Sequence, residues 1–161
     1  MDTFFVIHFL DEVKIGMQDA SIPKRHVTFL AHANSSDPKM KFKFAEEVER
    51  VAEATLCFTL QLGGTEMFGP NQDMPVTTVI GDEFSQKLHD QLLLSSQNLG
   101  LQLGQPQYTG VNFRPHVSLD TVNPRPDDRN FVQTLTLVRH IGGYGSGQVE
   151  VVSNSFLSVD W

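Results

Sequence analysis

His26-Val27-Thr28-Phe29 and His116-Val117-Ser118-Leu119 share one pattern: histidine, valine, a hydroxyl residue and a large apolar residue. In a β-strand, successive side chains point to opposite faces. The histidine and the hydroxyl of each stretch therefore share one face, and the two apolar residues share the other. We expect two strands that anchor in a core and present an imidazole beside a hydroxyl.

This pairing of residue types suits acid–base chemistry. Histidine changes charge near neutral pH, so two facing imidazoles can act as base and acid in one turnover. The hydroxyls can donate hydrogen bonds to an oxyanion held between them. Hydrolysis of a phosphodiester or opening of a cyclic phosphate needs such a set. We therefore select His26, Thr28, His116 and Ser118 as candidate catalytic residues, with no metal required. The alternative is that all four are ordinary strand residues.

The flanking sequence supplies strands and two helices. Helical spacing of apolar residues marks two segments, and the second has Asp82 as a possible cap and Gly100 at its end. Alternation or β-branched content marks the others. The predicted helices are 42–54 and 82–100, and the predicted strands are 3–10, 26–31, 56–62, 76–80, 102–108, 113–120, 133–140, 148–152 and 155–161. Residues 34–38 and 123–128 are predicted to be loops.

Strands interspersed with two amphipathic helices predict an α+β fold. Two similar motifs, each near a helix, suggest two pseudo-symmetric lobes of antiparallel sheet with outer helices. A central cleft between the lobes would let the two histidine faces meet. The chain has 161 residues and no long linker, so we expect one two-lobed domain over residues 1–161.

Composition limits the function. The net charge of −7 argues against a broad basic surface for long nucleic acid, although Lys24, Arg25 and Arg114 allow a locally positive cleft. No apolar run is long enough for a membrane span, and the first apolar run is too short and lacks the basic flank of a signal peptide. With Cys57 as the only cysteine, a cytoplasmic protein without disulfides is expected.

The two motifs resemble those of the two-histidine (2H) phosphoesterase superfamily, which includes 2′-5′ RNA ligase-like proteins and cyclic nucleotide phosphodiesterases. The family is recognised by two copies of His-x-Thr/Ser-x. The stretch Phe113 to Leu119 is especially similar to its second motif. The resemblance implies a two-lobed fold with both motifs facing a cleft. It also implies that His26 and His116 form the acid–base pair and that Thr28 and Ser118 bind phosphate.

Substrate binding falls to neighbouring residues. Arg114 shares the strand parity of His116 and is a candidate phosphate ligand. The resemblance implies an aromatic stack for the base, for which Tyr108, Phe113, Tyr144 and Phe68 are candidates. His32 could border the cleft, whereas His89 is expected to be solvated on its helix. Residues 142–147 predict a hairpin turn, because no P-loop ending follows. No cysteine or histidine cluster suggests zinc, and no cofactor is expected.

The leading hypothesis is a metal-independent phosphodiesterase that acts on a cyclic phosphate or on a 2′-5′ or 3′-5′ linkage. Its substrate would be a small nucleotide or an oligonucleotide, RNA ends included, and the protein would be a monomer. One alternative is a catalytically silent module that binds nucleotides or RNA ends. Another is a purely structural interaction domain, for which both motifs would have to be coincidental.

Overall fold

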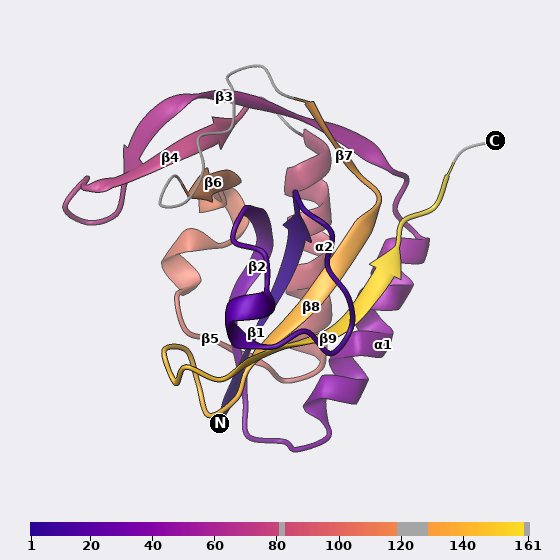
Figure 1. Ribbon diagram of the computed structural model, residues 1–161. Helices are drawn as coiled ribbons and strands as arrows, with labels where there is room; N and C mark the ends of the chain where they lie inside the picture. The colour runs from indigo at the N-terminus through magenta and orange to yellow at the C-terminus, as the bar shows by residue number, and fades with distance from the viewer. Residues whose placement is uncertain (81–82, 119–128, 160–161) are drawn as a thin grey trace.

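The computed structural model describes residues 1–80, 83–118 and 129–159 (Figure 1). Within these residues the chain forms two α-helices, α1 (Met40–Glu53) and α2 (Glu83–Asn98), and three short 3-10 helices, η1 (Asp19–Ser21), η2 (Pro106–Tyr108) and η3 (Gly110–Asn112). The strands are β1 (Asp2–Phe9), β2 (His26–Ser35), β3 (Phe58–Phe68), β4 (Met74–Val79), β5 (Gln102–Leu103), β6 (His116–Ser118), β7 (Arg129–Val132), β8 (Thr134–His140) and β9 (Val149–Phe156).

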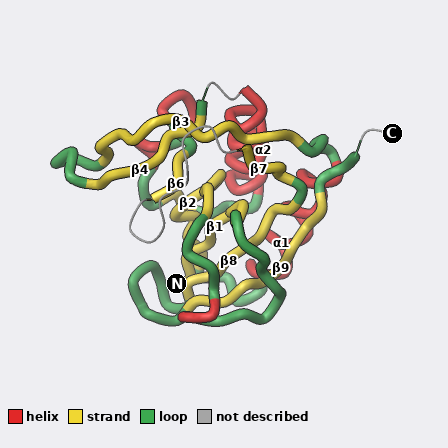
Figure 2. The backbone as a smooth tube through the Cα atoms, turned by 45° about the horizontal axis from the view of Figure 1, so that its top comes forward, coloured by secondary structure: helices red, strands yellow, loops and turns green. Residues whose placement is uncertain are grey.

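The strands form two antiparallel sheets, as the α+β prediction requires. The first has the order β5-β2-β1-β8-β9, and the second has the order β6-β4-β3-β7. Figures 1 and 2 show β3 crossing the top of the molecule, above the five-stranded sheet. The motif strands β2 and β6 belong to different sheets and contact each other, so the two lobes meet where the motifs lie.

A common apolar core joins the sheets and helices. It includes Val27 of β2, Phe44 of α1, Leu60 of β3, Leu88 of α2 and Val117 of β6. The apolar residues of the motifs are thus buried anchors, as the alternation predicts. Leu119 lies outside the described residues. Helix α1 packs on β8 and β9, while α2 packs on β2 and on η3, which precedes the second motif.

Several predicted boundaries are wrong. Strand β2 runs on to Ser35, through part of the predicted loop, and β3 runs through Gly63 and Gly64 to Phe68. Only residues 102–103 of the predicted strand 102–108 pair with a neighbour, and η2 follows them. Strand β9 joins the predicted strand 148–152 to the first residues of the predicted strand 155–161 and ends at Phe156. The expected cap Asp82, the loop at 123–128 and Trp161 lie outside the described residues.

Strand β7 was not predicted at all, although it pairs with β3 and completes the second sheet. The β8–β9 connection is a hairpin, as expected from its glycines. Among the residues that the structure describes, neither helix is long and apolar enough to cross a membrane.

Candidate active site

Both motif histidines line one cleft, whose volume is about 810 Å³. His26 begins β2 and His116 begins β6. Strand alternation places Thr28 and Ser118 on the same side as their histidines, and both hydroxyl residues line the cleft too. The structure therefore brings together all four residues that the sequence selects as catalytic candidates.

The two imidazoles are held in the same way. His26 Nδ1 lies 2.7 Å from the carbonyl oxygen of Lys24, and His116 Nδ1 lies 2.8 Å from that of Arg114. A carbonyl oxygen can only accept a hydrogen bond, so Nδ1 carries the proton in both rings. Each neutral imidazole thus keeps its basic lone pair on Nε2. The two motifs thus hold their histidines in the same tautomer and by the same kind of backbone contact.

Each imidazole also rests against an aromatic wall. The His26 ring lies 5.7 Å from Phe9, and the His116 ring lies edge-on to Phe68 at 4.8 Å. Burial is the main cause that lowers the pKa of both histidines below its ordinary value. The bonded carbonyls oppose this by raising the pKa, and neighbouring positive charge adds to the lowering: His116 for His26, and Arg114 for His116. Both rings are therefore neutral at pH 7.

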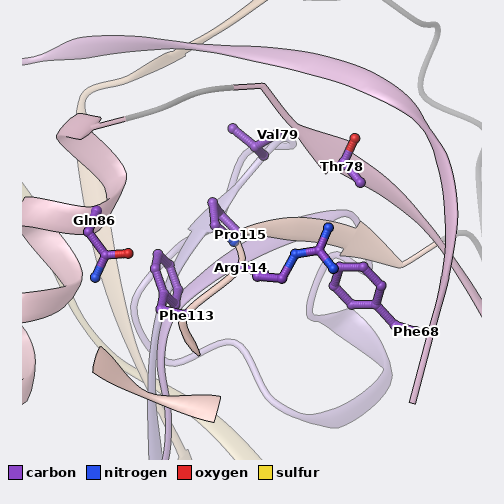
Figure 3. Close-up of a pocket in the computed structure, with 7 residues that line it drawn as sticks. All are labelled: Phe68, Thr78, Val79, Gln86, Phe113, Arg114 and Pro115. Atoms are coloured by element: carbon purple, nitrogen blue, oxygen red, sulfur yellow. The ribbon is translucent and has the colours of Figure 1, made fainter. Parts of the chain in front are cut away.

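Arg114 stands at the cleft rim with its guanidinium already engaged. Its Nη2 lies 2.8 Å from Glu66 Oε2, and the guanidinium lies over the Phe68 ring at 4.6 Å from the centroid. Figure 3 shows Arg114 beside Phe68, in a smaller hollow of about 210 Å³ that adjoins the cleft. A phosphate at Arg114 would have to compete with Glu66, a residue that the sequence did not single out.

The predicted aromatic residues all line the cleft but differ in what they offer. Phe113 is partly buried, and His89 stacks on it with ring centroids 4.1 Å apart and planes at 1°. One face of Phe113 is thus covered. Tyr108 and Tyr144 are 51% and 65% exposed and leave ring surface open to a ligand. Phe68 packs against both His116 and Arg114, so its main contacts are with the site itself.

The prediction that His89 is solvated is wrong. Its side chain is 1% exposed and borders the cleft. Its Nδ1 donates to the Phe29 carbonyl at 2.6 Å, and its Nε2 accepts the Gly110 N–H at 2.9 Å. His89 therefore joins the strand of the first motif to the turn before the second. Leu88 and His89 are consecutive, and both are buried. The side of α2 that faces the core is therefore wider than the spacing of its apolar residues indicates.

The side chains of the cleft do not form a metal site of the usual kind. Over the described parts of the chain, no group of three or more His, Cys, Asp or Glu side chains is arranged to bind an ion. The polar groups that face the cleft beside the histidines are mainly hydroxyls, amides and the Arg114–Glu66 pair.

No protein-family model matches the chain, and no curated protein matches it. Solved structures do match. A phosphoesterase aligns with a TM-score of 0.68 and 14% identity, over 98% of both chains. TT0787 of Thermus thermophilus aligns with a TM-score of 0.67 and 17% identity, over 99% of this chain and 100% of that chain. LigT of E. coli, complexed with NADP+, aligns with a TM-score of 0.67 and 14% identity, over 98% of both. The chain therefore has the same two-lobed α+β fold as these structures, which include a phosphoesterase and LigT.

Proposed function

We propose that this protein is a metal-independent phosphodiesterase that hydrolyses a cyclic phosphate or a 2′-5′ or 3′-5′ linkage in a nucleotide or oligonucleotide. One observation carries the proposal. Two imidazoles from different sheets line one cleft, and each keeps Nε2 for proton transfer because a backbone carbonyl occupies Nδ1. The shared fold supports the choice, since LigT of E. coli has been crystallised with NADP+, 3′-AMP, ATP and phosphate.

The proposed chemistry balances with the residues of the cleft alone. One histidine takes a proton from the attacking water through Nε2 while the water oxygen bonds to phosphorus. The other, protonated on Nε2, gives its proton to the leaving ribose oxygen as the P–O bond breaks. Thr28 and Ser118 donate hydrogen bonds to the non-bridging oxygens. At the end of the step, the proton has moved from one histidine to the other, so the pair resets by exchange with solvent.

The decisive variants are His26→Asn and His116→Asn. An asparagine amide can still donate to the carbonyl that holds Nδ1, but it cannot act as acid or base. Each variant should therefore fold and lose activity by about 10²- to 10⁴-fold, the range of general acid–base catalysis. Lys87→Asn, a position of α2 outside the cleft, is the matched control and should keep full activity.

The assay uses nucleoside 2′,3′-cyclic phosphates, 2′-5′- and 3′-5′-linked dinucleotides and cyclic dinucleotides, all in the presence of a chelator. Full activity of either asparagine variant would remove that histidine from the mechanism. Activity that appears only after a divalent metal is added would overturn the metal-independent step. Tight nucleotide binding without any product would instead identify a silent binding module.

A further inference from the structure

The cleft carries one positive and one negative charge that face each other. Among the described residues that line it, only Arg114 and Glu66 have side chains that are charged at neutral pH. Arg114 Nη2 lies 2.8 Å from Glu66 Oε2. Burial keeps the four histidines of the cleft wall neutral at pH 7. The described wall of a cleft that we assign to an anionic phosphodiester therefore has no net charge.

Strand pairing shows that Glu66 belongs to the face of the second sheet that bears the catalytic hydroxyl. Val76 on β4 pairs with Ser118 on β6 and with Glu66 on β3. Directly paired residues of antiparallel strands point to the same face of the sheet. Glu66 and Ser118 thus share one face and stand two strands apart, which is about 10 Å. The carboxylate is part of the cleft face and not of the outer surface.

Arg114 is close enough to act on a phosphate held at His116. Its guanidinium lies over the Phe68 ring at 4.6 Å from the centroid (Figure 3). The Phe68 centroid lies 4.8 Å from that of His116. The two contacts keep the guanidinium carbon within about 10 Å of the His116 ring centre, which is the Debye length at 0.1 M salt. An anion at His116 would therefore be attracted by Arg114, and Glu66 opposes this attraction.

The proposed reaction increases the negative charge of the bound ligand. A phosphodiester or a cyclic phosphate has one negative charge. Its hydrolysis gives a phosphomonoester, whose second pKa is about 6, so the product carries nearly two negative charges at pH 7.5. The energy between charges scales with their product. An arginine without a counter-charge would thus hold the product more firmly than the substrate.

We propose that Glu66 is a specificity-determining residue, which pairs with Arg114 and so weakens the binding of the dianionic monoester relative to the monoanionic diester. The inference rests on the proposed function, since it takes the phosphate to lie at the motif histidines. Glu66 acts through Arg114 and not on the reacting atoms. Its effect is to favour release of the product.

The first test measures binding without turnover. A nucleoside 3′-phosphate and a nucleoside 3′-methylphosphonate have similar size but carry two and one negative charges. Both are titrated by calorimetry at pH 7.5 and low salt into wild type and Glu66→Gln, which keeps the size of the side chain and removes its charge. The variant should bind the phosphate about fivefold more tightly and the methylphosphonate about twofold, because an exposed ion pair is worth at most about this much.

Two further variants show whether the effect comes from the pair. Glu49→Gln makes the same change of net charge at an exposed position of α1 outside the cleft, and should leave both affinities unchanged. In an Arg114→Gln background, Glu66→Gln should change neither affinity, because no guanidinium is left to be released. Equal tightening for both ligands, no tightening, or a full gain without Arg114 would overturn the proposal.

The second test uses turnover of a nucleoside 2′,3′-cyclic phosphate. Glu66→Gln should lower the inhibition constant of the monoester product about fivefold and KM about twofold, so an unchanged ratio of the two constants would overturn the proposal. If the wild type turns over no substrate, the proposed function fails. The calorimetric comparison still decides the role of Glu66 in that case, because it needs binding alone.

Discussion

His8 should make the folded state lose stability in mild acid. Its side chain is 7% exposed on β1, and its Nε2 has no hydrogen-bond partner among the described residues. Burial lowers its pKa from 6.5 to about 4, with a bond to the Thr134 backbone as a smaller opposing cause. Between pH 6.5 and pH 4, His8 is protonated in the unfolded chain but stays neutral in the folded chain. Stability is therefore full above pH 6.5 and falls as the pH drops towards 4.

The size of the effect follows from the pKa difference. One pKa unit corresponds to about 1.4 kcal/mol, so the complete loss is about 3 kcal/mol and the loss already reached at pH 5 is about 2 kcal/mol. This is a large part of the stability of an ordinary domain. Urea unfolding at pH 7.5 and pH 5 gives the free energy of unfolding at each pH.

His8→Leu and His8→Gln remove the titrating group and leave the other histidines in place. The wild type should lose about 2 kcal/mol more than either variant between the two pH values, whatever the absolute stability of the variants. The reasoning would be refuted if wild type and both variants lost the same amount, because the acid sensitivity would then come from other groups.

Three further predictions concern the cleft. The pH profile of kcat/KM should be bell-shaped with its maximum below pH 6.5, because burial lowers the pKa of both His26 and His116 in the free protein. A maximum above pH 7 would contradict this prediction. Thr28→Val and Ser118→Ala should each lower kcat by roughly 10²- to 10³-fold with little change in KM, because the hydroxyls would act mainly on the transition state. Single-turnover assays measure this effect. A change in KM alone would contradict it. His89→Leu leaves two backbone groups unpaired and should cost about 2–4 kcal/mol in urea unfolding, so a loss below about 1 kcal/mol would show that water or relaxation replaces them.

Local sequence rules predict the motif strands well because one physical feature, the two-residue period of a strand, fixes both faces of each. If the histidines face the cleft, Val27 and Val117 must face the core, and both valines are buried there. The same rules fail where a contact from a distant segment decides the outcome. The acceptors and donors of His89 are backbone groups of Phe29 and Gly110, which no helical pattern can reveal.

Gly63 shows why β3 is longer than its sequence indicates. A glycine pair usually marks a turn, which is why the predicted strand ends before it. A Cβ at Gly63 would lie 2.7 Å from Thr78 Oγ1 and 2.9 Å from an Ile80 side-chain carbon. The glycine therefore serves close approach to β4 rather than a turn. The two register shifts of β2 between Thr28 and Ala33 escape prediction for a related reason, since each extra residue changes which face the following side chains occupy.

The low basicity of the two motif histidines has a consequence for the proposed reaction. Turnover needs one imidazole protonated, yet burial keeps both neutral at pH 7. A bound phosphodiester would supply the missing negative charge between them, and an opposite charge in a partly buried site would raise the pKa of each ring. Substrate binding would thus draw in the proton that the acid then uses. Because the pKa of His26 is lowered partly by the charge of His116, the second ring resists a second proton, and one acid beside one base is the favoured state.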